Sequence, residues 1–535
     1  MKGSYLISQV LIFDGENRPP KKGSVLVRDG FIERVGDIPR EDVPEETTHI
    51  ELPGLAVSPG FINMHSHSDT AVLIHPEASN LVRQGITTEV VGNCGSSACF
   101  MKQKDESRWE RLKAAGIERM WDGVKGYLDA VDAVRPAVNV ATLVGHGEIR
   151  SLIAGDSGRP LDEPEKARMR EIALRAVEEG AFGISSGLEY VPGRFADVEE
   201  LAEISRGVAS LGGIHASHIR NEGPELLESV REAIAVARRS GVFFEIAHLK
   251  ACGPDNWGKV ALALEMIEAA AKDGVKVSAD FYPYLASSTG LSIVLPDWVL
   301  ENGKDGAVAV LTGETTRTKA EAEADRRTLA QGGWDKVVIT RVSRPDNKWM
   351  EVKDIAAIAR QLGVTPARAA VDLLLEEDMD VGIVRFAMSE EDLVEVMKFK
   401  ESTVVTDGNV AVPEEGKVHP RSVGTFPRVL GYYARERGVL SMEEAIYKMT
   451  GLPARKLGIG DRGLLRPGFR ADLVVFDPAL IIDRATYENP WQYPVGIHSV
   501  FVNGEPVLWE GEVTGRRPGE AVRRTVGASR SAPVV

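Results

Sequence analysis

Between residues 59 and 461, short apolar segments alternate with longer amphipathic ones, and this alternation restricts the fold more than any other feature. Strand-length apolar segments followed by helix-like segments, such as 162–179 and 224–239, are typical of βα units and a parallel sheet. Eight such units predict a (β/α)8 barrel of the TIM type, of roughly 250 residues or more. The eight candidate strands are LAVSPGFINMHSH, ITTEVVGNC, VNVATLVGH, AFGISSGL, GGIHASHI, GVFFEIAHLK, KVSADFYPY and STVVTDG. An open doubly wound α/β sheet is the alternative, but no GxGxxG motif follows the first strand.

The two ends of the chain differ from its middle. Residues 1–58 and 462–517 alternate apolar and polar residues between glycine turns, which predicts short strands. We expect both ends to form one small β domain, a sandwich or barrel, beside a catalytic barrel of residues 59–461. A long segment separates the last two candidate strands; within it residues 300–345 predict an inserted lid over the barrel mouth, and residues 352–398 predict helices that continue the barrel wall.

Charge and composition exclude several classes of partner. The formal net charge is −15 and the chain contains no basic run, so it is poorly suited to bind nucleic acid or an anionic membrane. No segment approaches the ~18 consecutive apolar residues of a membrane span, and the N-terminus lacks the apolar core of a signal peptide. Three cysteines in a long chain favour a reducing compartment. We therefore expect a cytoplasmic protein with a small-molecule substrate; a homo-oligomer is possible, but the sequence does not indicate one.

Metal-binding residue types recur where the candidate strands end. His65 and His67 end the first strand, and residues two apart on a strand point to one face. Four more such residues end other strands: Cys94, His218, His248 and Asp407. Singly, each has an ordinary explanation as a packed core residue. Together they would meet at the carboxyl-terminal mouth, where barrel enzymes place their sites, and imidazole, thiolate and carboxylate are the usual zinc ligands.

Two segments, PGFINMHSHSD and QGITTEVVGNCGSSA, resemble the amidohydrolase superfamily and, within it, the N-acyl-D-amino-acid deacylases, or D-aminoacylases. Further segments resemble that family in its order, including SSGLEYVPG, HASHIRNEG, AHLKACG, ADFYPY and HPRSVGTFPRVLGYY. The resemblance extends to about residue 522. It implies a metal-bearing (β/α)8 barrel with a β domain from both termini, and zinc-dependent hydrolysis of N-acyl-D-amino acids to a carboxylate and a free D-amino acid.

The resemblance also implies roles for the metal ligands. Cys94 takes the place of the carboxylated lysine of many other amidohydrolases. One tight zinc position would use Cys94, His218 and His248, and a second, weaker position would use His65, His67 and Asp407. Asp407 would be the proton shuttle, taking a proton from a water that the metal acidifies toward a pKa of about 7 and delivering it to the leaving nitrogen.

Four residues are candidates for binding the substrate's carboxylate, a role that the resemblance also assigns to them. Lys250 lies two residues beyond His248 and should share its face, and Arg421 follows strand eight and can offer a bidentate fork. Tyr282 and Ser288 follow strand seven and can add hydroxyl donors. One departure from the family pattern concerns the metal site: Asn63 stands where the family usually has an aspartate before the His-x-His pair.

Two other functions remain open. Hydrolysis of a cyclic amide or a β-aspartyl dipeptide is the alternative within the enzyme class, but those relatives usually carry a bridging lysine on strand four, and AFGISSGL has none. A non-catalytic barrel scaffold would be expected to lose metal ligands. For the leading function, four apolar residues after strand seven predict a preference for apolar side chains: Leu291, Ile293, Val294 and Leu295.

Overall fold

The computed structural model describes residues 3–100, 106–118 and 120–525. At its centre is a closed ring of parallel strands, formed by a six-stranded sheet, β17-β13-β12-β11-β10-β9, and a three-stranded sheet, β6-β7-β8. Strands β8 and β9 are consecutive parts of one strand, so the ring has eight positions, each matching a candidate strand from the sequence. The ring closes where the Asp407 backbone N–H donates to the His65 carbonyl (3.0 Å) and the His67 N–H donates to the Gly408 carbonyl (2.7 Å). The strands are β6 (Phe61–Asn63), β7 (Ile86–Val91), β8 (Asn139–Thr142), β9 (Val144–Gly145), β10 (Gly183–Gly187), β11 (Ile214–His218), β12 (Phe243–Ile246), β13 (Val277–Phe281) and β17 (Ser402–Val404).

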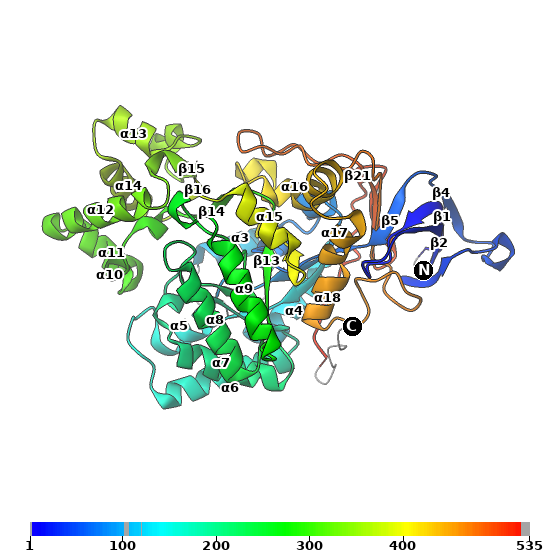
Figure 1. Ribbon diagram of the computed structural model, residues 1–535, viewed down its shortest axis with the longest axis horizontal. Helices are drawn as coiled ribbons and strands as arrows, with labels where there is room; N and C mark the ends of the chain where they lie inside the picture. The colour runs from blue at the N-terminus through cyan, green and yellow to red at the C-terminus, as the bar shows by residue number, and fades with distance from the viewer. Residues whose placement is uncertain (1–2, 101–105, 119, 526–535) are drawn as a thin grey trace.

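Helices surround this barrel, as Figure 1 shows for α6 to α9. Local sequence explains where they begin: Asp162 caps the first turn of α6, and the Glu165 side chain returns the bond to the Asp162 backbone. The helices bury one apolar stripe each against the strands, whose residues are nearly all buried, including polar ones such as Glu89, Glu245 and Asp280. The main wall helices are α6 (Glu163–Glu178), α7 (Val198–Ser210), α8 (Leu226–Ser240), α9 (Lys259–Lys272), α15 (Glu390–Lys398), α17 (Met442–Met449) and α18 (Gly451–Leu457).

A nine-stranded sheet combines the two ends of the chain at the right of Figure 1. Strand β18 from the C-terminal part pairs antiparallel with β5 from the N-terminal part. Alternating residues such as Ile7, Val25 and Phe501 fill its own apolar core. Its strands are β1 (Tyr5–Ile12), β2 (Lys21–Arg28), β3 (Phe31–Gly36), β4 (Thr48–Glu51), β5 (Ala56–Pro59), β18 (Leu473–Phe476), β19 (Ile497–Val502), β20 (Glu505–Trp509) and β21 (Glu512–Val513).

The insertion between the last two barrel strands is larger than the expected 300–345. A three-stranded antiparallel sheet, β14-β16-β15, packs with five helices around a separate apolar core; residues 286–386 are called the inserted unit below. Helices α13 and α14 belong to this core, so the expectation that residues 352–398 continue the barrel wall is wrong for these two helices. It holds for α15, which packs on α9 and β13. An amphipathic pattern shows that a helix buries one face, but not against which core. The elements are β14 (Ala286–Gly290), α10 (Asp297–Leu300), α11 (Gly303–Thr312), α12 (Glu314–Leu329), β15 (Val337–Arg341), α13 (Ile355–Leu362), α14 (Pro366–Glu376) and β16 (Gly382–Phe386).

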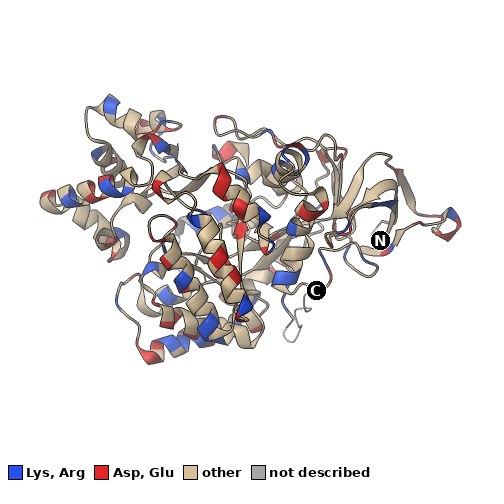
Figure 2. Cartoon of the chain, in the orientation of Figure 1, with Lys and Arg blue, Asp and Glu red and all other residues tan. Residues whose placement is uncertain are grey.

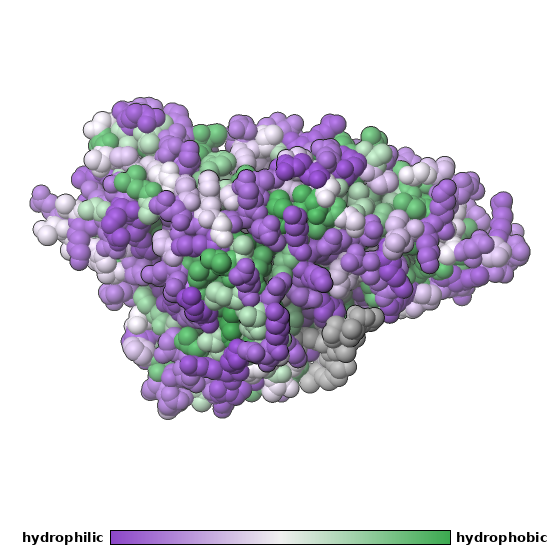
Figure 3. All heavy atoms as spheres, in the orientation of Figure 1, coloured by the Kyte–Doolittle hydropathy of each residue, from purple (hydrophilic) through white to green (hydrophobic). Residues whose placement is uncertain are grey.

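Charged residues of both signs are interleaved along the outer helices (Figure 2). The face in Figure 3 is mostly hydrophilic, and its apolar residues form separate patches. Among the described residues, no helix combines the length and the apolar character needed to cross a membrane.

Candidate metal centre and substrate cavity

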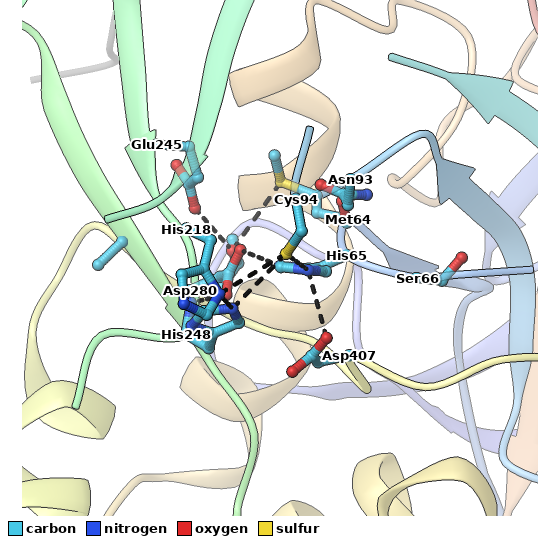
Figure 4. A network of polar contacts seen from close by, with 12 residues as sticks. Met64, His65, Ser66, Asn93, Cys94, His218, Glu245, His248, Asp280 and Asp407 are labelled. Atoms are coloured by element: carbon cyan, nitrogen blue, oxygen red, sulfur yellow. Dashed lines mark hydrogen bonds and ion pairs between the residues drawn. The ribbon is translucent and has the colours of Figure 1, made fainter. Parts of the chain in front are cut away.

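All six predicted ligands lie at the carboxyl ends of the barrel strands. Figure 4 shows five of them, His65, Cys94, His218, His248 and Asp407, gathered around a common point. His218 is the last residue of β11, and the others lie two to four residues beyond the ends of their strands. The segment after β6 supplies both His65 and His67, and the latter reaches the same cluster through Asp407.

The ligand atoms are close enough to bind a metal ion together. The Cys94 Sγ lies 3.3 Å from His65 Nε2, 3.7 Å from His248 Nε2 and 4.0 Å from His218 Nδ1. The Asp407 Oδ1 lies 3.3 Å from His65 Nε2 and 3.0 Å from His67 Nε2. One ligand atom from each of His65, Cys94, His248 and Asp407 falls within 4.8 Å of the other three. This convergence of histidine nitrogen, thiolate sulfur and carboxylate oxygen atoms fits a zinc ion, and packing alone does not explain why these side chains meet.

Electrostatics favour the ligand forms of Cys94 and Asp407. Burial raises the pKa of the Cys94 thiol, but the charge on His65 and hydrogen bonds with His218 and His248 hold it well below its ordinary value. Burial likewise raises the pKa of Asp407, but the Arg421 guanidinium and His65 outweigh it and hold that pKa well below the usual range. The Arg421 Nη1 lies 2.7 Å from Asp407 Oδ2. Both side chains are therefore held as anions, the state in which they bind metal.

Three of the predicted histidine ligands, His65, His218 and His248, have a polar partner on the ring nitrogen that faces away from the cluster. Asp280 Oδ2 lies 3.3 Å from His65 Nδ1, and Glu189 Oε2 lies 2.9 Å from His218 Nε2. These contacts fix the ring orientation and the tautomer of a ligating histidine. The sequence interpretation missed Asp280, although a carboxylate inside an apolar strand is itself a signal because it is costly to bury without partners.

The partner of His248 is an ion pair. Glu222 Oε1 lies 2.9 Å and Lys250 Nζ 2.7 Å from His248 Nδ1, and the two charged groups are 2.5 Å apart. Burial lowers the pKa of Lys250, but Glu222 outweighs it and raises that pKa above its ordinary value. Lys250 therefore contacts the side of the His248 ring remote from Cys94, and it is only 5% exposed. The expected shared face fails because the chain leaves strand geometry at His248, whose φ is +35°.

Asn63 contacts no histidine ligand among the described residues. Its amide nitrogen donates to Glu89 Oε1 and to Thr406 Oγ1, each at 2.8 Å, and its oxygen accepts from the Thr406 backbone N–H. Asn63 thus joins the first barrel strand to the last, and Asp280 supplies the carboxylate that orients His65.

A cavity of about 570 Å³ opens over the ligands. Two of the four predicted carboxylate binders, Ser288 and Arg421, line it. Tyr282 is buried beneath Arg421, whose guanidinium carbon is 4.6 Å from the ring centroid, and neither Tyr282 nor Lys250 is among the described lining residues. Arg385 on β16 also lines the cavity and was missed, because nothing in the sequence places β16 beside the site.

Only one of the four apolar residues after strand seven reaches this cavity. Ile293 lines it, whereas Leu291, Val294 and Leu295 are buried in the core of the inserted unit. The interpretation that all four face the substrate is therefore wrong for three of them. Their apolar character serves a second core that the sequence did not reveal.

Comparisons with known proteins show which chains this one is similar to. The model of the amidohydrolase family matches residues 48–508. The chain is 35% identical to D-aminoacylase from Alcaligenes xylosoxydans xylosoxydans, covering 97% of each protein, and 34% identical to an N-acyl-D-aspartate deacylase of that organism, covering 97% of this chain and 95% of the relative. A crystal structure of N-acyl-D-glutamate deacylase from Bordetella bronchiseptica, complexed with zinc and a phosphonate inhibitor, superposes with a TM-score of 0.83 at 33% identity and covers 98% of this chain and 100% of its own.

Proposed function

This chain belongs to the amidohydrolase family, in its N-acyl-D-amino-acid deacylase group, and from that premise we propose that it hydrolyses N-acyl-D-amino acids with zinc. The observation that carries the proposal is the meeting of six metal-binding side chains from five separate strand ends beneath one cavity. The relatives named above act on linear N-acyl-D-amino acids, and one of them is a zinc complex.

We assign Cys94, His218 and His248 to the tighter zinc position. His65, His67 and Asp407 would form the weaker one. When bound, zinc supplies Lewis acidity: it polarises a carbonyl group and makes water acidic enough to attack an amide at neutral pH. The protein holds Cys94 and Asp407 in their deprotonated forms and orients the histidines through Asp280, Glu189 and the Glu222–Lys250 pair.

Asp407 is the proposed proton shuttle. Its carboxylate is held ionised by Arg421 and lines the cavity, so it can accept the proton of the attacking water. It then donates that proton to the nitrogen of the departing amine, which is a poor leaving group until it is protonated. A serine or cysteine nucleophile is not required.

Cations in the cavity wall would hold the substrate's carboxylate. Arg421 and Arg385 both line the cavity, and each guanidinium is a planar fork that can bind a carboxylate through two hydrogen bonds. Ser288 adds a hydroxyl group on the same wall. Tyr282 would act by supporting the Arg421 guanidinium, and Lys250 by orienting His248.

A screen of N-acetyl-D-amino acids against their L enantiomers tests the proposal. We expect zinc-loaded protein to release free amine from several D substrates and at least 100-fold more slowly from the L forms. Elemental analysis should find zinc in the active protein. Hydrolysis confined to hydantoins or β-aspartyl dipeptides, or zinc-loaded protein inactive on every D substrate, would refute it.

A further inference from the structure

His419 is a buried histidine, only 5% exposed, that is not one of the predicted metal ligands. It lies two residues before Arg421, the first residue of helix α16 (Arg421–Arg428). Its ring packs edge to face against Tyr284 at a centroid distance of 5.4 Å and against Tyr487 at 5.1 Å. Tyr284 follows β13, and Tyr487 belongs to the connection between β18 and β19, so three separate parts of the chain meet at this ring.

We propose that His419 is a positioning residue, which holds Arg421 where the guanidinium group reaches both Asp407 and the substrate's carboxylate. The part that concerns the substrate's carboxylate rests on the proposed function. The inference goes beyond that function, because hydrolysis of an N-acyl-D-amino acid by the residues named so far assigns no role to His419.

Both ring nitrogens of His419 have a backbone partner. The Nε2 atom lies 2.9 Å from the Ala286 carbonyl oxygen, which can only accept, so Nε2 carries the proton and donates it. The Nδ1 atom is then an acceptor, and it receives the Arg421 backbone N–H at 3.0 Å. Burial and the charge on Arg421 hold the pKa of His419 well below its ordinary value, so the ring stays neutral. Ala286 thus fixes the tautomer that can accept from Arg421.

The position of the Arg421 side chain depends on this hydrogen bond. The Arg421 N–H is one of the donors that the first turn of a helix leaves without an intrahelical partner. Because His419 accepts it, the direction in which α16 begins is fixed, and with it the origin of the Arg421 side chain. That side chain lines the cavity, places Nη1 2.7 Å from Asp407 Oδ2 and lies 4.6 Å from the ring centroid of Tyr282. A guanidinium group with these contacts loses one of them when its backbone shifts.

The same histidine connects the barrel to the inserted unit. Ala286 is the first residue of β14 and pairs with Phe386, the last residue of β16, where the chain enters and leaves this unit. Ser288 lies two residues beyond Ala286, and Arg421 lies two residues beyond His419. His419 therefore sets the spacing between two proposed carboxylate-binding groups that belong to different parts of the fold.

A purely structural role, in which His419 only fastens this junction, is the alternative. Two other hydrogen bonds join the same segments: the Tyr284 hydroxyl donates to the Pro420 carbonyl at 3.4 Å, and Arg428 Nε donates to the Pro283 carbonyl at 2.9 Å. Neither bond involves Arg421. Removing one of them therefore disturbs the junction and leaves the contact between His419 and Arg421 in place, so the two roles can be separated.

Two variants of His419 separate these roles in zinc-loaded protein assayed with N-acetyl-D-leucine. Phenylalanine keeps a ring but has no acceptor for the Arg421 N–H, whereas asparagine is smaller but can place its amide oxygen near the position of Nδ1. We expect His419→Phe to raise KM about tenfold and to lower kcat about tenfold, a loss of the size that a misplacement of about 1 Å can cause. His419→Asn should keep KM and kcat close to those of the wild type.

The Michaelis constant distinguishes positioning from a structural role, because a smaller folded fraction lowers kcat and leaves KM unchanged. Tyr284→Phe is the matched control: it removes a hydrogen bond from the same junction, keeps its ring, and should leave both constants near the wild-type values. A folded His419→Phe protein with an unchanged KM, or a His419→Asn protein as impaired as His419→Phe, would overturn the inference. If His419→Phe fails to fold, His419→Gln replaces it, because its amide can donate to the Ala286 carbonyl but leaves the Arg421 N–H without an acceptor.

Crystal structures of the same proteins at equal metal content give a readout that needs no substrate. We expect the contact between Arg421 and Asp407 to be as in the wild type in His419→Asn and to exceed hydrogen-bond distance in His419→Phe. An Arg421 side chain that stays in place in His419→Phe contradicts the inference, whatever the activity. Wild-type protein that hydrolyses no N-acyl-D-amino acid would refute the proposed function, and these structures would still decide whether His419 positions Arg421.

Discussion

Asp280 connects two of the predicted metal ligands, His65 and His248, through its two carboxylate oxygens. Oδ2 lies 3.3 Å from His65 Nδ1, and Oδ1 accepts the backbone N–H of His248 at 2.5 Å. Because His65 Nε2 faces Cys94 and Asp407, a ligating His65 carries its proton on Nδ1 and donates it to Asp280. Asp280→Asn can keep the acceptor for His248 while placing an NH2 group against His65, so it breaks one contact selectively.

The expected cost follows from that geometry. Losing the carboxylate partner of a ligating histidine typically costs 10–100-fold in metal affinity or activity. We expect Asp280→Asn to weaken zinc binding by that range, about 1.4–2.7 kcal/mol, and to lower kcat/KM similarly at limiting zinc. Asp280→Ala also leaves the buried His248 N–H unpaired, which should cost a further 1–3 kcal/mol, roughly, in the free energy of unfolding.

Competition with a chelator of known affinity measures the zinc constant, and denaturant unfolding of the metal-free protein measures stability. Asp392→Asn is the matched control: Asp392 is a buried aspartate that accepts the Gly258 backbone N–H and contacts none of the six predicted ligands. Zinc affinity and kcat/KM of Asp280→Asn equal to those of Asp392→Asn would refute the reasoning.

Three further predictions concern the same site. Cys94→Ala should lose the tight zinc and nearly all hydrolysis, and elemental analysis checks this; stoichiometric zinc at wild-type turnover contradicts the assignment. Asp407→Asn should retain the tighter zinc, but its kcat, measured at saturating substrate, should fall by a factor of about 10²–10⁴. If the variant keeps most of its turnover, Asp407 is not the proton shuttle, and Glu148 and Glu189 are the next candidates. The kcat/KM for N-acetyl-D-leucine, measured beside that for N-acetyl-D-glutamate, should be the higher of the two. The reason is that Ile293 gives the cavity apolar surface and that an unpaired carboxylate is costly to bury. A clear preference for the glutamate substrate would contradict this prediction.

Sequence periodicity predicts the barrel well and the inserted unit poorly. Each of the eight candidate segments contains a barrel strand, because a parallel strand buried on both faces is rich in apolar residues and has turn residues at its ends. The inserted unit defeats this reasoning because its strands pair antiparallel with partners far along the chain: β14 pairs with β16, and β16 with β15. Such pairing leaves no local signal, so neither its bounds nor its separate core could be read from the sequence.

Ligand types at strand ends predict which side chains meet, but not the groups behind them. The six residues gather because parallel strands bring their carboxyl ends to one rim, whatever the details of the loops. Lys250 and Arg385 show the limit of this argument. Lys250 lies close to His248 in the sequence but turns to Glu222, and Arg385 reaches the cavity from a unit that the sequence left unplaced.

Backbone geometry supplies what strand periodicity cannot. Cys94, His248 and Asp407 all have left-handed backbone conformations, with φ of +52°, +35° and +47°. Such a conformation costs a residue other than glycine on the order of 1–3 kcal/mol, and it persists only where the surroundings enforce it. Here they do, because the His248 N–H is bound by Asp280 and the Asp407 N–H by the His65 carbonyl. The left-handed turn redirects each side chain from the direction that strand alternation would give it toward the common centre. The contacts of the folded barrel therefore stabilise a backbone conformation that these three predicted ligands would rarely adopt in an unconstrained chain.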